Sequence, residues 1–397
     1  MAEINWRRNL WFLWISQLLS MAGFAGIMPF IPLFIGSKFG ITDQTELGAW
    51  VSAFNFFGMA SFCLSNPVWG ILADRYGRKL MLLRSSFCNA VCFPLFVAMP
   101  NCAMLVVMRF IASSFSGTTA AAQTLIATTV PEKHQGFALG LLTSAIWSGT
   151  MLGYISGAVI VRHFGYVAGF LLCGAIYLIS GFIVLFFVRE NFVPQPEIRK
   201  DGLSAQFHAM SHAILMLLAL FALLGFARRF DEPYLAMMVR HISAMQDDFV
   251  ISWTGYISAA AAAGGILSGI VIGKLCDRYA PYIVALPMLA LACIGLAGQG
   301  MSTNVGTLAA MRALTYFSGG GLEPAFLKLL AQETAPEHRG AVFGFSMSAR
   351  MLGIFSAAGV SGVVLFHFGL RQVYFTAAIL MLLLLPLMIL YRVRFAK

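Results

Sequence analysis

Long apolar stretches that recur along the whole chain constrain its fold more than any other feature. They lie near residues 9–35, 46–72, 80–99, 102–129, 137–161, 167–188, 213–239, 249–273, 281–300, 304–331, 340–365 and 371–391. A helix needs about 20 mostly apolar residues to cross the hydrocarbon core of a bilayer. The sequence therefore predicts an all-α membrane protein with twelve transmembrane helices.

Composition argues against a water-soluble protein. Hydrophobic residues make up 59% of the chain and charged residues only 11%, whereas soluble domains carry about 25% charged residues. The seven cysteines fall mostly inside apolar stretches, without CxxC or Cys/His metal spacing, so we interpret them as packing residues and predict no metal and no cofactor. The first apolar stretch follows Trp6-Arg7-Arg8 and has no small-residue cleavage site, which indicates a transmembrane helix and not a removed signal peptide.

Lys and Arg residues are distributed unequally between the two sides of the membrane. With a cytoplasmic N-terminus, the inside segments hold Arg7, Arg8, Arg75, Arg78, Lys79, Lys133, Arg189, Arg199, Lys200, Lys274, Arg278, Arg339, Arg392, Arg394 and Lys397. The outside loops hold only Lys38, Arg162, Arg240 and Arg371. Because basic residues concentrate on the cytoplasmic side, we predict that both termini lie inside. This distribution also explains the net charge of +10 without a nucleic-acid partner.

The two halves of the chain repeat each other at a shift of about 204 residues. The repeated landmarks are Pro29 and Pro233, Asp74 and Asp277, Arg109 and Arg312, Pro131 and Pro336, and His163 and His367. The longest polar stretch lies between the halves, so we predict a bundle over 1–190, a cytoplasmic linker over 191–212 and a second bundle over 213–397. Parallel repeats of this kind place the substrate site at their interface, near the membrane midplane.

One loop carries a specific family resemblance. Gly70-Ile-Leu-Ala-Asp74-Arg75-Tyr-Gly77-Arg78-Lys79 is similar to the signature loop between the second and third helices of the major facilitator superfamily. A degenerate copy, Gly273-Lys274-Leu-Cys-Asp277-Arg278, follows at the repeat distance. The first half resembles bacterial drug:proton antiporters of the MdtG-like kind, through Met28-Pro29-Phe30-Ile31-Pro32 and Arg78-Lys79-Leu80-Met81-Leu82-Leu83-Arg84-Ser85. The resemblance covers the whole chain and implies two pseudo-symmetric six-helix bundles and a location in the bacterial inner membrane.

Charges in such loops can hold one access state and release in the other. We therefore expect a conformational lock formed by Gly70, Asp74, Arg75, Gly77, Arg78, Lys79, Asp277 and Arg278. The alternative is a solvated turn whose charges only set the topology.

Two features of the first half are candidates for function. Arg109 lies within an apolar stretch, where a charge is costly unless it is paired or faces water. The resemblance associates an arginine there with proton coupling, and a structural arginine that donates to backbone carbonyls is the alternative. Gly149, Gly153 and Gly157 form a smooth stripe on one helix face, which allows close approach of a neighbour. The stripe resembles an antiporter motif, with Tyr154 in place of its proline, and ordinary helix packing accounts for it equally well.

The second half holds charges within its apolar stretches. Arg228 can reach Asp231 or Glu232 at helical spacing of three and four residues. Either acid is a candidate partner of Arg312, and Glu323 and Arg350 form a second candidate pair.

These charges allow three interpretations. Glu323 first, and Asp231 or Glu232 after it, can carry a proton, because burial favours the neutral form of a carboxylate. The surplus arginines, which are Arg228, Arg229, Arg312 and Arg350, can instead bind an anionic substrate. A gate network without substrate contact is the third interpretation. Trp147, Trp253 and Tyr256 are candidates to line an apolar pocket, or they face lipid or pack between helices.

The motifs of ATP-driven pumps and of hydrolases do not occur in the sequence, so we predict a transporter and not an enzyme. The repeat and the buried charges favour alternating access over a channel. We predict proton-coupled efflux of small amphipathic organic compounds; the alternative is transport of an organic anion such as a carboxylate metabolite or siderophore. The expected partners are the substrate, protons and lipid, and a single chain is expected to hold the whole pathway.

Overall fold

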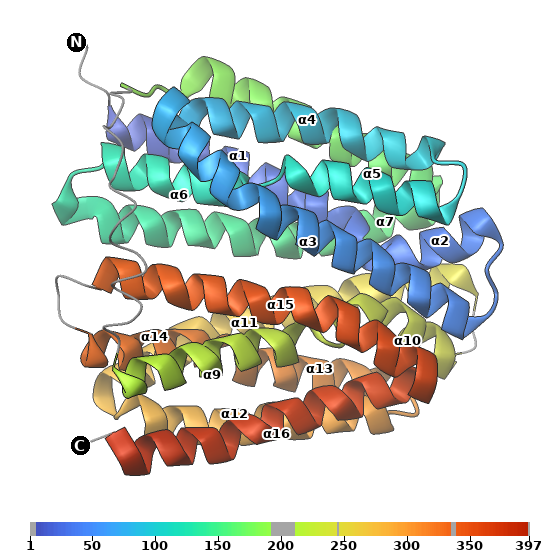
Figure 1. The fold of residues 1–397 in the computed structure, drawn as a ribbon. Coiled ribbons are helices and arrows are strands. Elements are labelled where there is room, and N and C mark those ends of the chain that lie inside the picture. The colour runs from blue at the N-terminus through green and yellow to red at the C-terminus, as the bar shows by residue number, and fades with distance from the viewer. Residues whose placement is uncertain (1–4, 192–210, 244–245, 335–338, 396–397) are drawn as a thin grey trace. The chain divides into compact units, whose positions relative to one another are not determined.

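The computed structural model describes residues 5–191, 211–243, 246–334 and 339–395, and the chain within these ranges is almost entirely helical (Figure 1). The first half contains α1 (Trp6–Ile27), η1 (Met28–Phe30), α2 (Ile31–Phe39), α3 (Gln44–Tyr76), α4 (Arg78–Ala98), α5 (Cys102–Ser114), α6 (Thr118–Thr129) and α7 (Glu132–Phe187). The second half contains α9 (His212–Arg229), η3 (Glu232–Tyr234), α10 (Leu235–Ser243), α11 (Asp247–Arg278), α12 (Pro281–Met301), α13 (Val305–Gly320), α14 (Leu322–Glu333), α15 (Arg339–Phe368) and α16 (Leu370–Phe395).

Nine helical segments in the described ranges are long and apolar enough to cross a membrane. The predicted twelve crossings follow once broken and joined helices are counted. The long helix α7 is two crossings joined at Gly165, whose φ of 77° and ψ of 174° are not helical. The fourth crossing consists of α5 and α6 and the tenth of α13 and α14, so in each case two short helices together span the bilayer.

The breaks recur at the repeat distance, which shows that the two halves share one plan. Pro29 lies in the first turn of η1 and Pro233 in the first turn of η3, because proline fits the first turn of a helix and cannot donate inside one. Gly165 and Gly369 adopt positive φ angles of 77° and 89°, a conformation that favours glycine. Each proline or glycine thus reorients the chain at the same point of both halves.

The described helices group into two compact units. Unit 1 comprises Met1–Gly40, Phe57–Ile198 and Thr254–Ala259, and unit 2 comprises Ile41–Phe56, Arg199–Trp253 and Ala260–Lys397. Helices α3 and α11 therefore contribute to both units. The predicted division into 1–190, a linker over 191–212 and 213–397 stays a prediction, since residues 192–210 lie outside the described ranges.

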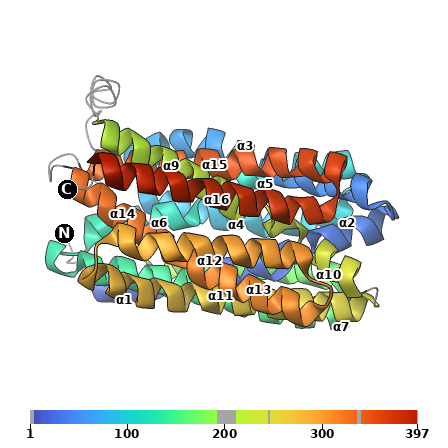
Figure 2. The ribbon, with the colours of Figure 1, turned by 90° about the horizontal axis from the view of Figure 1, so that it is seen from below.

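Close helix packing through glycine organises each unit. In unit 1, a Cβ atom on Gly149 would run into the backbone of Leu18 in α1, and Gly157 meets Gly26 in the same way. In unit 2, Gly353 of α15 meets Ala222 of α9. Gly149 and Gly353 are repeat mates. In unit 2, α9 packs against both α15 and α16. Figure 1 shows α9 between these two helices, and Figure 2 shows the three running alongside one another.

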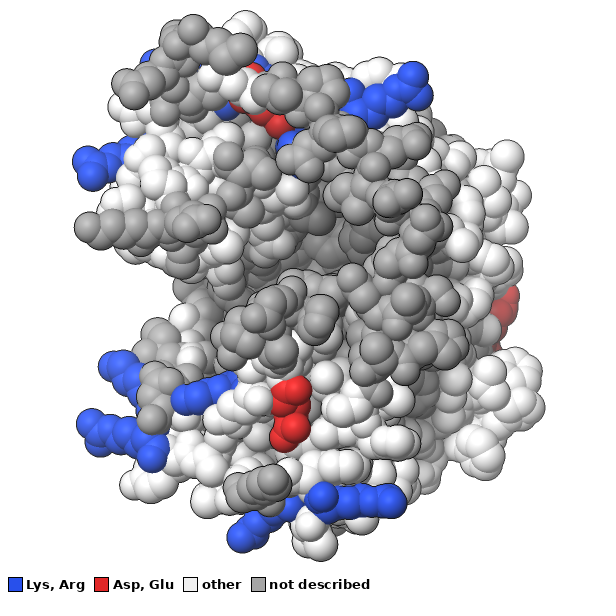
Figure 3. Space-filling model, turned by 60° about the vertical axis from the view of Figure 1, so that its left-hand side comes forward, with Lys and Arg blue, Asp and Glu red and all other residues white. Residues whose placement is uncertain are grey.

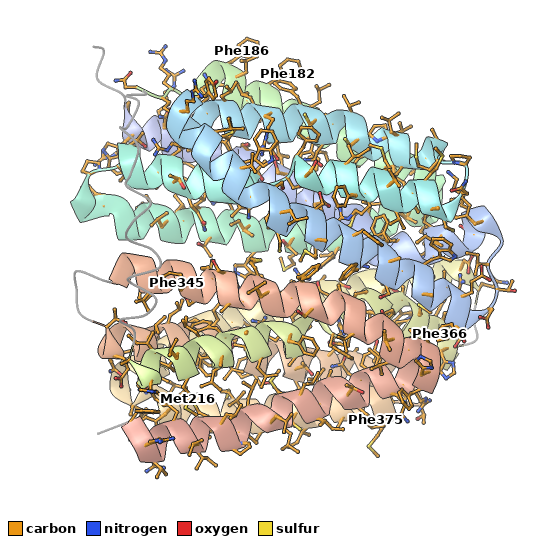
Figure 4. All side chains as sticks on the ribbon, in the orientation of Figure 1. Phe182, Phe186, Met216, Phe345, Phe366 and Phe375 are labelled. Atoms are coloured by element: carbon orange, nitrogen blue, oxygen red, sulfur yellow. The ribbon has the colours of Figure 1, made fainter. Side chains whose placement is uncertain are left out.

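The outer helix faces carry large apolar side chains. Phe182 and Phe186 of α7 stack with ring centroids 6.0 Å apart and project away from unit 1 (Figure 4). The side chain of Phe186 is 68% exposed. Such surfaces suit a hydrocarbon environment, where helices satisfy their own backbone hydrogen bonds.

Candidate transport site

A fully buried ion pair lies at the centre of the charged cluster of unit 2. Nη1 of Arg312 in α13 lies 2.6 Å from Oδ2 of Asp231, and the two side chains are 2% and 4% exposed. The same nitrogen donates to Oε1 of Gln299 at 3.0 Å, and Nη2 donates to the Tyr316 hydroxyl at 3.4 Å. Gln299 in turn donates to Thr315 at 2.9 Å. Of the two predicted partners of Arg312, the structure therefore pairs it with Asp231.

The break in the seventh crossing positions Asp231. Helix α9 ends at Arg229, and the chain restarts as η3 with Pro233 in its first turn. Asp231 occupies the N-cap of η3 but makes no capping hydrogen bond with its side chain. Its carboxylate is therefore available to Arg312.

A second predicted pair, Glu323 with Arg350, is also present. Nη1 of Arg350 in α15 lies 2.7 Å from Oε1 and 2.8 Å from Oε2 of Glu323. The side chains of Arg350 and Glu323 are 22% and 23% exposed, so this pair is accessible to solvent, whereas the pair of Asp231 and Arg312 is not. Glu323 lies in the first turn of α14, directly after the break at Gly321.

The third pair corrects a prediction. Glu232 pairs with Arg229, three residues earlier, and Asp231 pairs with Arg312. The predicted contact of Arg228 with either acid is wrong: its side chain turns to α13, where a Cβ atom on Gly319 would lie 3.6 Å from Nε. The three acids therefore each hold one arginine, and among the described residues no carboxylate pairs with Arg228.

In unit 1, the side chain of Arg109 in α5 is buried. Its side chain is 8% exposed, and its Cζ lies 5.6 Å from the ring centroid of Phe24. A Cβ atom on Gly58 would lie 2.6 Å from the Arg109 Nε, so the glycine leaves room for the guanidinium.

The predicted lock loop is anchored by a residue that sequence reasoning missed. Gly77, with φ of 94°, precedes α4 and offers no side-chain cap. Instead Glu190 accepts hydrogen bonds from the backbone N–H groups of Arg78, at 3.0 Å, and Lys79, at 2.8 Å. Lys79 Nζ donates to the Leu185 carbonyl at 2.9 Å. The sequence signal that could have indicated Glu190 is a carboxylate directly after an apolar stretch.

The other lock candidates are placed only in part. Arg75 is exposed and lies 5.4 Å from the ring centroid of Tyr76, and Arg278 is exposed at the end of α11. Gly70 has open space beside its Cα. The side chains of Asp74 and Asp277 lie outside what the structure describes.

The aromatic candidates have different surroundings. Trp147 of α7 is half-buried in unit 1, and Tyr256 of α11 is 51% exposed. In unit 2, Trp253 packs against Phe249 with ring centroids 5.8 Å apart. Among the described residues no group of His, Cys, Asp and Glu could hold a metal ion.

Comparison with known proteins agrees with this arrangement. The family model of the Major Facilitator Superfamily matches residues 13–239 and 217–396. A Multidrug resistance protein MdtG of Proteus mirabilis is 31% identical over 381 residues, which cover 94% of each chain. The MdtG of a Rahnella species is 29% identical over 383 residues, covering 96% of this chain and 92% of the relative.

Solved structures share the fold at low sequence identity. A bacterial homologue of the human lysosomal transporter Spinster, in an inward-facing and unoccupied conformation, has a TM-score of 0.79 at 13% identity and covers 98% of both chains. The nucleoside transporter NupG has a TM-score of 0.78 at 14% identity, with coverage of 96% of this chain and 99% of that chain. With its repeated six-helix plan and a matching family model over both halves, the chain belongs to the major facilitator superfamily and is a membrane transporter, not an enzyme.

Proposed function

We propose that this transporter exports small amphipathic organic compounds in exchange for protons, by alternating access. The ion pair of Glu323 and Arg350 carries the proposal, because it combines a membrane-embedded carboxylate with partial exposure. The similarity to proteins named for multidrug resistance supports the export of drug-like compounds.

In this proposal Glu323 is the proton carrier. Arg350 stabilises the charged carboxylate through the ion pair. Protonation of Glu323 breaks the pair and frees Arg350, so the helices α14 and α15 lose a contact that favours one state. Proton binding then shifts the balance between access states by the difference in its affinity for each.

Several predicted features belong to the same proposal. The transporter works as a monomer in the bacterial inner membrane, with both termini in the cytoplasm. The loop from Gly70 to Lys79 acts as the conformational lock, and its anchoring by Glu190 supports this role. Arg109, Asp231 and Glu232 contribute to coupling through the positions of their charges.

Proton flux in liposomes tests the proposal. Purified protein is reconstituted with an internal pH dye, and lipophilic cations or organic anions are added in turn. We expect amphipathic substrates to trigger proton movement that Glu323→Gln abolishes. The matched control is Asp247→Asn, which removes an ion-paired but exposed carboxylate and should leave the flux unchanged. Substrate-driven flux that survives in Glu323→Gln contradicts the role of Glu323.

Transport of an organic anion is the second candidate, and Arg228 favours it. The cluster contains four arginines and three acids. The three acids pair with Arg229, Arg312 and Arg350, so that no carboxylate of the cluster pairs with Arg228. A carboxylate substrate would supply the missing charge by hydrogen bonds to the guanidinium. In the same liposomes, a response to anions alone that Arg228→Gln removes and Arg371→Gln leaves intact would establish this candidate.

A further inference from the structure

Three buried hydroxyl groups meet in unit 2 where η3, α3 and α15 come together. The hydroxyl of Tyr234 in η3 shares a hydrogen bond of 3.2 Å with Oγ of Ser361 in α15. It also interacts with the hydroxyl of Ser52 in α3, which donates to the Ala358 carbonyl at 2.7 Å. Tyr234, Ser361 and Ser52 are all buried. This hydroxyl cluster therefore joins three segments that are far apart in the sequence.

The hydroxyl cluster lies at a close contact between α3 and α15. A Cβ atom on Gly362 would run into the side chain of Ser52, so the two helices approach each other without room for a larger residue. Close by, Phe56 stacks on Phe355 with ring centroids 4.9 Å apart. The residues of this α3–α15 contact all belong to unit 2, whereas α3 continues from Phe57 into unit 1. The contact therefore joins the first part of α3 to unit 2.

The short helix η3 connects the hydroxyl cluster to the buried ion pair of Asp231 and Arg312. Asp231 is the N-cap of η3, and the backbone N–H of Tyr234 donates to the Asp231 carbonyl at 3.1 Å. Arg312 of α13 holds the Asp231 carboxylate, while Ser361 of α15 holds the Tyr234 hydroxyl. The ion pair and the hydroxyl cluster therefore position the same turn of the chain from its two ends.

The repeat provides an internal control, because unit 1 makes the corresponding contact without hydroxyl groups. At a shift of 203 or 204 residues, the mates of Tyr234, Ser361 and Ser52 are, in that order, Phe30, Gly157 and Gly255. In unit 1 a Cβ atom on Gly255 of α11 would run into Ala158 of α7, which is the mate of Gly362. The same close packing therefore forms in unit 1 with a phenylalanine in place of the tyrosine. The fold alone does not require the hydroxyl cluster of unit 2.

We propose that Tyr234 is a positioning residue whose hydroxyl stabilises the α3–α15 contact and thereby favours the access state in which this contact is closed. The inference rests on the proposed alternating access. Because α3 continues from the contact into unit 1, a movement between the units changes how α3 lies against α15. The bonds of the Tyr234 hydroxyl to Ser361 and Ser52 exist together only while the contact is closed. They therefore stabilise one state relative to the other by the free energy of these bonds.

Distance measurements on the full-length protein test this role. Spin labels are attached to Thr42→Cys, just before α3, and to Phe368→Cys, at the end of α15, in a variant without the native cysteines. Both positions are exposed. Double electron–electron resonance then gives the ratio of long to short distances, which compares proteins with an open and a closed α3–α15 contact. Tyr234→Phe should raise this ratio about fivefold, the effect of one neutral hydrogen bond.

Tyr374→Phe is the matched control. Tyr374 lies in unit 2 and is as buried as Tyr234, but its hydroxyl has no hydrogen-bond partner among the described residues. Its removal should leave the distance ratio at the wild-type value. Ser361→Ala should raise the ratio as Tyr234→Phe does, and the double variant should add little, because both changes remove the same hydrogen bond.

The two variants and the wild type together decide the proposal. An unchanged ratio in Tyr234→Phe, or an equal rise in Tyr374→Phe, overturns the role of the hydroxyl. A lower thermal unfolding temperature of Tyr234→Phe with an unchanged ratio would show a structural role only and would also overturn it. Tyr234→Phe should fold, since the mate Phe30 occupies the same position in unit 1 and both serines still donate to the Ala358 carbonyl.

The distance measurement is independent of the proposed proton exchange, because it needs neither a substrate nor a proton gradient. A raised ratio in Tyr234→Phe, in a wild type that shows no substrate-driven proton flux, would support the role of Tyr234 and reject the proposed exchange. Proton flux in the wild type together with an unchanged ratio in Tyr234→Phe would support the exchange and reject the role of Tyr234.

Discussion

Arg109 and Arg312 occupy the same position in the two repeats but have different surroundings. Arg312 is neutralised by Asp231, whose repeat mate is Ile27, whereas Arg109 packs over Phe24 and beside Gly58. The same repeat position therefore has a carboxylate partner in unit 2 and an aromatic neighbour in unit 1. The side chains of Arg312 and Asp231 are 2% and 4% exposed. Loss of either one would leave the charge of the other buried and uncompensated, so both are needed for the stability of the fold.

Asp231→Asn should accordingly destabilise the protein strongly. Removing one partner of a buried pair costs about 3–5 kcal/mol, and an apolar replacement of both partners is often neutral. We expect Asp231→Asn to lower the thermal unfolding temperature in detergent and the double variant Asp231→Leu with Arg312→Met to restore most of it. Asp247→Asn, in an exposed pair with Arg240, should cost no more than about 1 kcal/mol. Equal unfolding temperatures for Asp231→Asn and Asp247→Asn would show that the buried pair is dispensable.

At the scale of elements, the glycine stripe of α7 decides how closely α1 can pack. Cβ atoms on Gly149, Gly153 and Gly157 would each run into backbone atoms of α1, which cannot move as a side chain can. The stripe therefore has a packing role in unit 1, as the spacing of four residues predicted. A role in antiport remains a prediction.

Gly153→Ala should separate packing from a general effect of alanine. The added methyl group meets the Ala22 carbonyl, and overpacking of this kind costs about 1–3 kcal/mol. Gly140→Ala is the matched control, since Gly140 lies on the same helix with no atom within 4 Å of its Cβ position. Thermal unfolding in detergent should show a loss for Gly153→Ala only. A comparable loss in Gly140→Ala would mean that helix backbone freedom, and not contact with α1, explains the effect.

For the whole molecule, the distribution of charge predicts the orientation in the membrane. Lys and Arg side chains are prominent on the face seen in Figure 3, where few Asp and Glu side chains appear. Basic residues beside transmembrane helices are retained on the cytoplasmic side. The seven native cysteines are buried or half-buried. In a variant in which they are replaced, single introduced cysteines can report the topology.

Labelling of intact cells with a membrane-impermeant maleimide checks this orientation. Thr42→Cys and Met301→Cys lie in exposed predicted outside segments and should react without permeabilisation. Tyr76→Cys and Tyr279→Cys, which are exposed at the opposite helix ends, should react only after permeabilisation. The reverse pattern would place both termini outside and refute the assignment.

By itself, the sequence determined the class, the number of crossings and the repeat. The signals for these features are local in sequence. They are the lengths of the apolar stretches, the prolines Pro29 and Pro233, and the glycines Gly165 and Gly369, each of which determines the backbone conformation of its own segment. The candidate pairs could also be proposed, because a charge in an apolar stretch needs a partner.

Only the tertiary structure decided which partners meet. Arg228 and Arg229 are neighbours in sequence, and their different contacts depend on how α9 faces α13 and η3. Glu190 capping α4 and Tyr234 of η3 beside Ser361 of α15 also join segments distant in sequence. Helical periodicity fixes the direction of a side chain relative to its own helix, whereas the choice of neighbour depends on the packing of all the helices in the unit.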